Sequence, residues 1–263
     1  MILYIAVVAV AYFNQRSFLY HPDTKRYTPA QAGLDDFQEI AITIPEARLV
    51  SWWRPPADPN EPIIIAFHGN GGALADRAGH YADIAGKDFG LLTVGYPGYG
   101  GNGGEPSEAA FFKTALANYD WLIGQGYKAQ NIVILGQSMG TGVAVLLAEK
   151  RPSAGLVLQS PYTSIVEMAA IQMPFIPAEF LLKDRFDSLS RISRIKVPIG
   201  WIHSRKDELI PFAMGEQLFA AVRSRKCKLT LNEGGHNDMN SFAVADFARR
   251  NAVAMVKDKN CSQ

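Results

Sequence analysis

Residues 131–148 read NIVILGQSMGTGVAVLLA, and this stretch decides the fold class. Its first five residues are an apolar run of the kind found in strands buried on both faces of a parallel sheet. Its last seven residues have the composition of a helix. The G-x-S-x-G pattern at 136–140 lies between them and therefore places Ser138 on a tight strand-to-helix turn that exposes its hydroxyl. The pattern alone is common by chance in a chain with 23 glycines, so its setting carries the inference.

Strand-like and helical segments alternate along the rest of the chain. The patterns predict strands at 38–44, 48–53, 63–67, 91–94, 131–135, 155–158, 197–203 and 226–231. They predict helices at 74–87, 107–124, 139–150, 212–222 and 241–256. This alternation predicts an α/β protein with a mostly parallel eight-stranded sheet flanked by helices.

The interval between residues 159 and 197 interrupts the alternation. It carries Pro161, Pro174 and Pro177 among many apolar residues. The interval is too long for a turn and too apolar for a solvated loop, so we expect a small helical cap over a pocket at about 162–195. The alternative is an additional packing helix without a pocket.

The N-terminus is unbroken by any charge from residue 1 to residue 13. As a helix this run spans about 20 Å, against about 30 Å for a hydrocarbon core. A basic region typical of signal peptides is missing, so we expect a short uncleaved anchor at 1–14 that dips into the membrane interface. The alternatives are a misassigned start and a helix packed on the protein itself. Because Arg16, Lys25 and Arg26 follow the run, the positive-inside rule predicts a cytoplasmic catalytic domain.

Composition excludes several classes of protein. Of 263 residues, 48% are hydrophobic and 19% are charged, as in an ordinary globular domain. A net charge of +1 provides no field that would attract nucleic acid, so no nucleic-acid partner is expected. Two cysteines cannot by themselves build a disulfide framework or a structural zinc site. We expect a linker at 15–36 and one globular domain at 37–258.

A serine hydroxyl needs a base that takes its proton. Among the five histidines, His21 lies in the linker and His80 within a predicted helix, so both are expected at the surface. His68 and His203 end strands and are expected to help build the site. His236 lies in a glycine-bearing loop after the last strand and is the best candidate for the base.

The base should in turn be held by a carboxylate. Asp207 follows the strand at 197–203, at the sheet edge where open α/β sheets collect functional groups. Its rivals are Asp184 and Asp187 in the cap and Asp238, which is only two residues from His236. Taken alone, Asp207 could also cap a helix that starts near residue 211. The chain order serine, aspartate, histidine favours Ser138, Asp207 and His236 as a catalytic triad.

An oxyanion formed at the attacked carbonyl needs hydrogen-bond donors. The backbone N–H of Met139, the residue after the serine, is one expected donor. The loop HGNGG at 68–72 follows the third strand, and its glycines let backbone amides approach a bound oxygen. We expect the N–H of Asn70 to be the second donor.

A second glycine-rich loop, GYGGNG at 98–103, matches the dinucleotide fingerprint G-x-G-x-x-G. In that fingerprint the last glycine lies in the helix that the loop opens. Here Gly104 and Pro106 intervene before helical character begins. The loop therefore favours a wall of the active-site mouth over a nucleotide site.

The motifs resemble the α/β-hydrolase superfamily, especially a membrane-anchored branch that contains protein depalmitoylases and bacterial hydrolases. The resemblance covers nearly the whole chain, through QRSFLYHP at 15–22, HGNGG at 68–72, GYPGYG at 95–100, GQSMG at 136–140, SPYTS at 160–164 and GGH at 234–236. It implies a triad of Ser138, Asp207 and His236 and an oxyanion hole formed by Asn70 and Met139. The sequence departs from the family pattern at Gly95, where an aspartate is usual, and at Ser204, where a glycine is usual.

These patterns predict a serine hydrolase that cleaves esters or thioesters of hydrophobic acyl groups without a metal or an organic cofactor. The apolar cap suggests the acyl chain, and an anchor through residues 1–13 suggests lipidated or other ester substrates at a membrane. A serine peptidase or amidase is the closest alternative, because the same triad cleaves amides. A non-catalytic interaction protein of this fold is more distant, because such proteins commonly lack a triad member.

Overall fold

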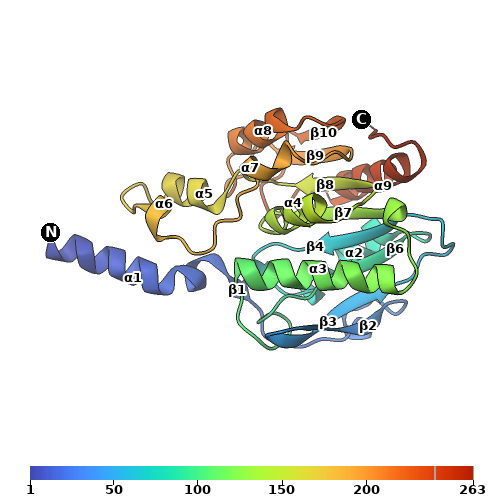
Figure 1. Ribbon diagram of the computed structural model, residues 1–263, viewed down its shortest axis with the longest axis horizontal. Coiled ribbons are helices and arrows are strands. Elements are labelled where there is room, and N and C mark those ends of the chain that lie inside the picture. Colours follow the sequence, from blue (N-terminus) through green and yellow to red (C-terminus); the bar gives the residue numbers. More distant parts are fainter. Residues whose placement is uncertain (240, 263) are drawn as a thin grey trace.

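The computed structural model describes residues 1–239 and 241–262 (Figure 1). Its centre is an eight-stranded sheet with the order β10-β9-β8-β7-β4-β6-β3-β2. The strands are β2 Gln38–Ile44, β3 Ala47–Arg54, β4 Ile63–Phe67, β6 Gly90–Thr93, β7 Ile132–Gln137, β8 Gly155–Gln159, β9 Ile199–Ser204 and β10 Lys226–Leu231. β3 pairs antiparallel with β2 and β6, and the other neighbours pair parallel. The predicted fold class is confirmed.

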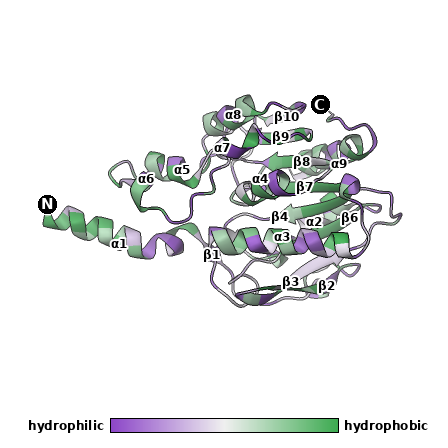
Figure 2. Ribbon diagram, viewed as in Figure 1, coloured by the Kyte–Doolittle hydropathy of each residue, from purple (hydrophilic) through white to green (hydrophobic). Residues whose placement is uncertain are grey.

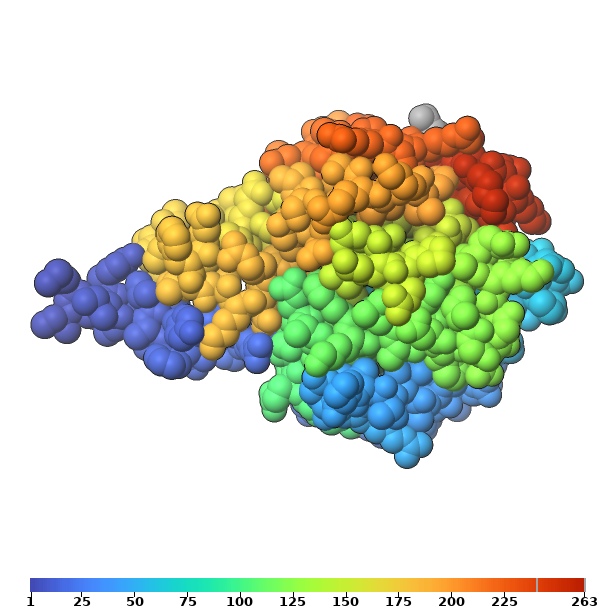
Figure 3. All heavy atoms as spheres, viewed as in Figure 1, coloured from blue at the N-terminus to red at the C-terminus, as the bar shows by residue number. Residues whose placement is uncertain are grey.

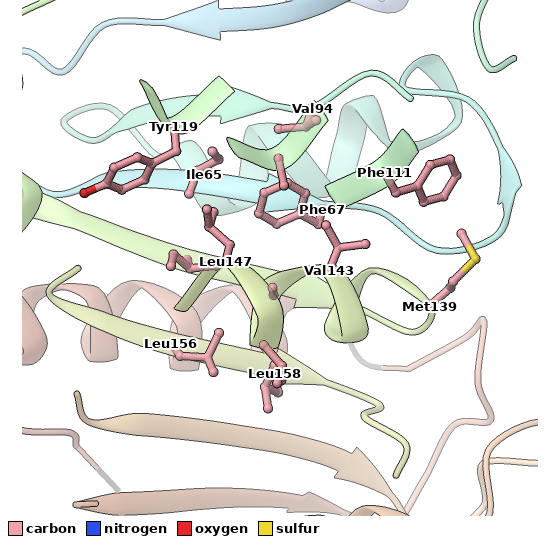
Figure 4. Close-up of a cluster of buried hydrophobic side chains, with 14 of the residues drawn as sticks. Ile65, Phe67, Val94, Phe111, Tyr119, Met139, Val143, Leu147, Leu156 and Leu158 are labelled. Atoms are coloured by element: carbon pink, nitrogen blue, oxygen red, sulfur yellow. The ribbon is translucent and has the colours of Figure 1, made fainter. Parts of the chain in front are cut away.

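Helices cover both faces of the sheet. They are α2 Ala78–Ala85, α3 Glu108–Gly124, α4 Gly140–Lys150, α8 Phe212–Ala221 and α9 Ser241–Lys257, with short 3-10 helices at Ala30–Ala32, Ala75–Arg77 and Ala129–Asn131. Alternate residues of β4 point to opposite faces: Ile65 belongs to the core on the side of α3, α4 and α8, whereas Ile64 belongs to the core on the side of α2 and α9. Figure 4 shows the first of these cores, where Ile65 and Phe67 meet Val143 and Leu147 of α4. Because apolar side chains fill the space between the sheet and the helices on both faces, the functional groups lie at the ends of the strands.

Several predicted elements differ from the observed ones at their ends, and two of these differences have a clear local cause. The helix expected at 74–87 is a 3-10 turn followed by α2, which ends where Gly86 takes a φ of +52°. The strand expected at 131–135 starts one residue later and continues to Gln137, because Gln137 pairs with Gln159 of β8. The sheet therefore reaches the residue just before Ser138.

The interval between β8 and β9 contains three short helices, α5 Ile165–Gln172, α6 Ala178–Leu181 and α7 Leu189–Ile192. The Ser164 hydroxyl caps α5 by accepting a hydrogen bond from the Glu167 N–H at 3.0 Å. α5 and α6 project away from the sheet, whereas Ile192 of α7 is buried in the main core. We use "cap" below for residues 164–185, which is shorter than the expected 162–195 because α7 packs as part of the body.

The N-terminal helix α1, Ile2–Leu19, continues through the start of the expected linker. Among residues 1–239 and 241–262, it is the one helix that is long and apolar enough to cross a membrane, by length and composition. It ends where Tyr20 becomes extended, and β1, His21–Pro22, then pairs in parallel with β5, Gly71–Gly72. This two-stranded sheet fastens the N-terminal segment to the loop at 68–72.

Gly140 permits the close crossing of α4 and β4. A Cβ there would lie 2.2 Å from the carbonyl oxygen of Phe67 and 2.6 Å from that of His68, and these backbone atoms cannot move without displacing β4. We expect Gly140→Ala to lower the free energy of unfolding by about 1–3 kcal/mol in urea denaturation. Gly124→Ala is the matched control, because a Cβ at Gly124 meets nothing within 4 Å. Equal stability of the two variants would contradict this account.

Candidate active site

Ser138 lies on the turn between β7 and α4. Its φ of +52° is in the left-handed region that serine rarely adopts, and the turn is held by hydrogen bonds from Ser138 N–H to Gln159 O and from Thr141 N–H to Ser138 O, both 2.9 Å. Such a strained position persists only where the surrounding structure enforces it. The close packing of Gly136 and Gly140 does so here, and it presents the Ser138 hydroxyl beyond the end of the sheet.

His236 lies in the loop between β10 and α9. Its Nε2 is 2.9 Å from Ser138 Oγ, and its Nδ1 is 2.8 Å from Asp207 Oδ2. The backbone N–H of His236 donates to Glu208 Oε2 at 2.9 Å. The structure therefore brings the three predicted residues together in one hydrogen-bonded chain, in the order serine, histidine, aspartate.

Asp207 is buried and accepts hydrogen bonds at both carboxylate oxygens. Oδ1 accepts from the N–H groups of Leu209 and Ile210 at 3.0 and 2.8 Å, and Oδ2 lies 3.2 Å from His203 Nε2 as well as near His236. Burial alone would raise the pKa of Asp207, but the hydrogen bonds from His203, His236 and Ile210 outweigh it and hold the pKa well below its usual range. Asp207 is therefore a fixed negative charge behind the imidazole.

The rival acids have other partners. Asp184 accepts from Arg16 Nε at 3.0 Å and from the Glu108 N–H at 3.1 Å, and Asp187 accepts from the Ser190 N–H. Asp238 accepts from the backbone N–H of Gly235 and so shapes the loop that carries His236. The structure gives Asp207 the position behind the imidazole.

The other histidines fall into different settings. His68 is buried with its ring 4.3 Å from that of Tyr96, and burial lowers the pKa of His68 well below its usual value. His203 is also buried, against Asp207. His21 is exposed, as expected, whereas His80 of α2 is half-buried, and this burial lowers the pKa of His80 to about 4.

Two contacts that the sequence did not reveal hold the His236 loop in place. Glu208 binds the His236 N–H, and the Ser204 hydroxyl donates to the carbonyl of Gly234. Ser204 is one of the two departures from the family pattern, and its hydroxyl thus ties β9 to the loop. At the other departure, Gly95, a Cβ would lie 2.0 Å from the Val50 carbonyl oxygen, so the backbone leaves no room for a side chain.

The loop at 68–72 lies opposite Ser138. Asn70 is held by three hydrogen bonds: its Nδ2 donates to Leu19 O at 3.1 Å, and its carbonyl accepts from His21 N–H at 3.0 Å and from the Tyr99 hydroxyl at 2.7 Å. Tyr99 comes from the glycine-rich loop at 98–103, which thus supports the site wall. Asn70 and Met139 line the same cavity as Ser138.

That cavity has a volume of about 420 Å³, within the range of small-molecule sites. At one end it is lined by Ser138 and His236. Its side walls come from the cap, with residues such as Met168, Ala169 and Ile176, and from α1, including Tyr12 and Phe18. The contribution of α1 is not apparent from the sequence, because α1 and the cap are far apart along the chain. The cavity is thus a mainly apolar chamber that ends at a serine–histidine pair.

Among the described residues, no group of three or more His, Cys, Asp or Glu side chains is placed to hold a metal ion. The arrangement itself can supply a base within reach of a hydroxyl and a carboxylate that orients this base.

Comparisons with known proteins agree with this architecture. The family described as serine aminopeptidase, S33, matches residues 58–186. An uncharacterised protein of Mycobacterium tuberculosis is 33% identical over 93% of this chain and 89% of its own length. Alpha/beta hydrolase domain-containing protein 17B of Homo sapiens is 31% identical over 70% of this chain and 64% of its own length.

More distant matches follow. A lysophosphatidylserine lipase of Danio rerio is 28% identical over 69% of this chain and 52% of its own length. The solved structure of an esterase from Pyrococcus furiosus has a TM-score of 0.70 at 18% identity, covering 91% of this chain and 98% of that one. At that identity the likeness shows the fold alone. Together, the fold and the relatives show that this chain belongs to the α/β-hydrolase superfamily and is a hydrolase.

Proposed function

We propose that this chain is a serine hydrolase that cleaves carboxylic ester or thioester bonds of hydrophobic acyl substrates through an acyl-enzyme. The observation that carries the proposal is the hydrogen-bonded chain from Ser138 through His236 to Asp207 at the end of an apolar cavity of about 420 Å³. Ser138, His236 and Asp207, with the loops that hold them, are sufficient for the bond-breaking steps.

In the first half of the reaction, His236 Nε2 takes the proton of Ser138 Oγ, which attacks the substrate carbonyl. The charge that develops on the carbonyl oxygen is held by the backbone N–H groups of Met139 and Asn70. Met139 lies at the start of α4, where the free N–H groups and the positive end of the helix dipole also favour an anion. His236 then gives its proton to the leaving alcohol or thiol, which departs and leaves the acyl group on Ser138.

In the second half, water replaces the leaving group. His236 takes a proton from this water, the resulting hydroxide attacks the acyl-enzyme, and the same two N–H groups hold the second oxyanion. Asp207 stays ionised throughout and stabilises the imidazolium that forms in each half. His236 then passes the proton taken from water to Ser138 Oγ as its bond to the acyl carbon breaks, which releases the carboxylic acid and restores the Ser138 hydroxyl.

The walls of the cavity support a hydrophobic acyl group. Met168, Met173 and Ile176 of the cap face the cavity, and methionine side chains adapt readily to flexible apolar ligands. The relative from Danio rerio is named as a lysophosphatidylserine lipase, which is consistent with acyl ester chemistry on this fold. Protein depalmitoylation, suggested by the sequence motifs, would use the same cavity for a thioester-linked acyl chain.

Ala169 offers a test of acyl-chain binding. It is a small, buried side chain of α5 on the cavity wall, so a phenylalanine there would fill space that a long chain needs. Across a series of nitrophenyl esters, we expect wild-type kcat/KM to rise with chain length. In Ala169→Phe it should fall about tenfold for the longest esters and change little for acetate. A wild-type enzyme without preference for longer chains would contradict the proposed substrate class.

A peptidase or amidase is the second candidate function, because the matching family is described as serine aminopeptidase, S33. The same residues would carry the reaction, with an amine as leaving group. Comparing kcat/KM for aminoacyl nitroanilides and for acyl nitrophenyl esters separates the two. We expect the acyl esters to be preferred, because the cavity walls are mainly apolar.

We also propose that the chain associates with a membrane through residues 1–13, with the catalytic domain on the cytoplasmic side. The support is the uncharged first part of α1 and the basic residues Arg16, Lys25 and Arg26 that follow. Protease protection of the catalytic domain in sealed inverted and right-side-out vesicles tests the orientation.

A further inference from the structure

The exposed apolar surface of the protein is concentrated at one end. Along α1 it includes Leu3 and Phe13, and on the cap it includes Ile171, Phe175 and Phe180. Phe180 is 85% exposed, although it is a large aromatic side chain. Soluble proteins rarely expose such contiguous apolar patches unless they bind a partner or a membrane. We call the exposed apolar residues of α1 and the cap the apolar tip. Figure 2 shows the two segments projecting together.

Specific contacts make α1 and the cap a single unit. Near the start of α1, the Tyr4 hydroxyl donates to the carbonyl of Phe175 at 2.9 Å. Near its end, Gln15 accepts from the Lys183 N–H at 2.8 Å, and Arg16 Nε donates to Asp184 Oδ2 at 3.0 Å. The cap therefore accompanies α1 along most of its length (Figure 3). Whatever medium surrounds the N-terminal half of α1 also surrounds the tip of the cap.

The charge of α1 and the cap changes from their exposed end toward the sheet. α1 carries no charged side chain before Arg16. Lys183 and Arg185 lie at the base of the cap, where the Lys183 N–H donates to Gln15 of α1 and the Arg185 guanidinium donates to the carbonyl of Glu179. Lys183 also lies over the ring of Tyr12, with Nζ 4.6 Å from its centre. The cap also carries three acids, but Asp184 is buried against Arg16 and Glu167 accepts a hydrogen bond from the Thr163 hydroxyl. Glu179 is therefore the exposed acid beside the exposed Lys183 and Arg185. An apolar end bordered by basic groups matches a bilayer, whose hydrocarbon is bordered by phosphates.

The backbone limits how deep this unit can enter. The segment between α5 and α6 is irregular and carries Pro174 and Pro177, and unpaired backbone groups are costly in hydrocarbon. α1 is about 27 Å long, close to the thickness of a hydrocarbon core of about 30 Å, so it could cross only with its whole length in the bilayer, including Arg16. Because the cap reaches as far as Tyr4, α1 cannot cross the bilayer without taking this irregular segment with it.

We propose that α1 and the cap insert together into one leaflet of a phospholipid bilayer, and that acyl substrates enter the cavity from that leaflet, between the two segments. The cavity lies between them, since Tyr12 and Phe18 of α1 and Met173 and Ile176 of the cap are among its walls. An ester already in the leaflet thus reaches Ser138 without transferring its acyl chain through water. The entry of substrate rests on the proposed ester hydrolysis, whereas the insertion does not.

Tryptophan fluorescence in vesicles tests the insertion in the full chain. Phe180→Trp and Leu3→Trp place a probe on each half of the apolar tip. Phe242→Trp is the matched control, because Phe242 is 78% exposed on α9, outside both α1 and the cap. In vesicles that contain phosphatidylglycerol and lipids brominated on the acyl chain, we expect at least twofold quenching for both tip probes. Shallow bromines should quench more than deep ones, and Phe242→Trp should show no quenching beyond the wild-type background.

Two outcomes would overturn the insertion. If α1 spans the bilayer alone, Phe180→Trp will remain unquenched while the chain still floats with the vesicles. If the apolar tip is instead covered by a second copy of the chain, light scattering will show a dimer and neither probe will be quenched. Both outcomes are independent of whether the chain hydrolyses esters.

Activity tests the route of entry. The double variant Phe175→Ser, Phe180→Ser removes two apolar tip side chains that do not line the cavity. We expect it to hydrolyse a long-chain ester held in vesicles about tenfold more slowly and nitrophenyl acetate in solution at the wild-type rate. An equal rate on the vesicle-bound ester would overturn entry from the leaflet. If wild-type protein hydrolysed neither ester, that result would instead contradict the proposed function.

Discussion

Ser138→Ala is expected to lower kcat for ester hydrolysis by about 10⁴-fold or more, with little change in stability. Alanine retains the turn but removes the oxygen that lies 2.9 Å from His236 Nε2, so no acyl-enzyme can form. The remaining rate comes from the oxyanion donors and from substrate binding alone, as is general for hydrolases of this type. A 10⁴-fold loss corresponds to about 5.5 kcal/mol of transition-state stabilisation.

The measurement combines steady-state kinetics on a nitrophenyl ester with covalent labelling by a fluorophosphonate. Wild-type protein should be labelled once, and Ser138→Ala should not be labelled. Ser190→Ala is the control, because Ser190 is an exposed serine of α7 outside the cavity. Labelling that persists in Ser138→Ala would show that another residue is the nucleophile.

The sequence was sufficient to predict the local geometry around Ser138. A buried strand, a G-x-S-x-G turn and a helix follow one another within residues 131–148, so their relation depends on short-range packing. Asp207 and His236 could also be chosen, because each follows a parallel strand and the ends of parallel strands meet at one sheet edge. The structure brings both to Ser138.

The parts that the sequence did not predict depend on contacts between distant segments. β1 pairs with β5 across about 50 residues, and Arg16 of α1 meets Asp184 of the cap across 168. No periodicity within either segment encodes such a pairing. These contacts bear on the site. The N-terminal helix, expected as a separate anchor, is a wall of the cavity and holds Asn70 through Leu19 O.

Asp207→Asn should distinguish Asp207 from the rival acids, with an expected loss of about 10⁴-fold in kcat. The amide oxygen would remain at the Oδ1 position, where the N–H groups of Leu209 and Ile210 donate to it. The amide NH₂ would then occupy the Oδ2 position and face His236 Nδ1, 2.8 Å away in the wild type. His236 would have to accept there and carry its proton on Nε2. In that tautomer it cannot take the proton of Ser138.

Asp238→Asn is the matched comparison, since Asp238 lies in the same loop as His236 but binds a backbone N–H instead of the ring. We expect Asp238→Asn to retain activity within about tenfold of wild type, because an amide oxygen can still accept that hydrogen bond. Circular dichroism and urea denaturation of both variants separate catalytic loss from misfolding. If Asp207→Asn were as active as Asp238→Asn, the imidazole would have to be oriented by another group, and the hydrogen bonds that His203 and Ile210 make to Asp207 would serve the fold alone.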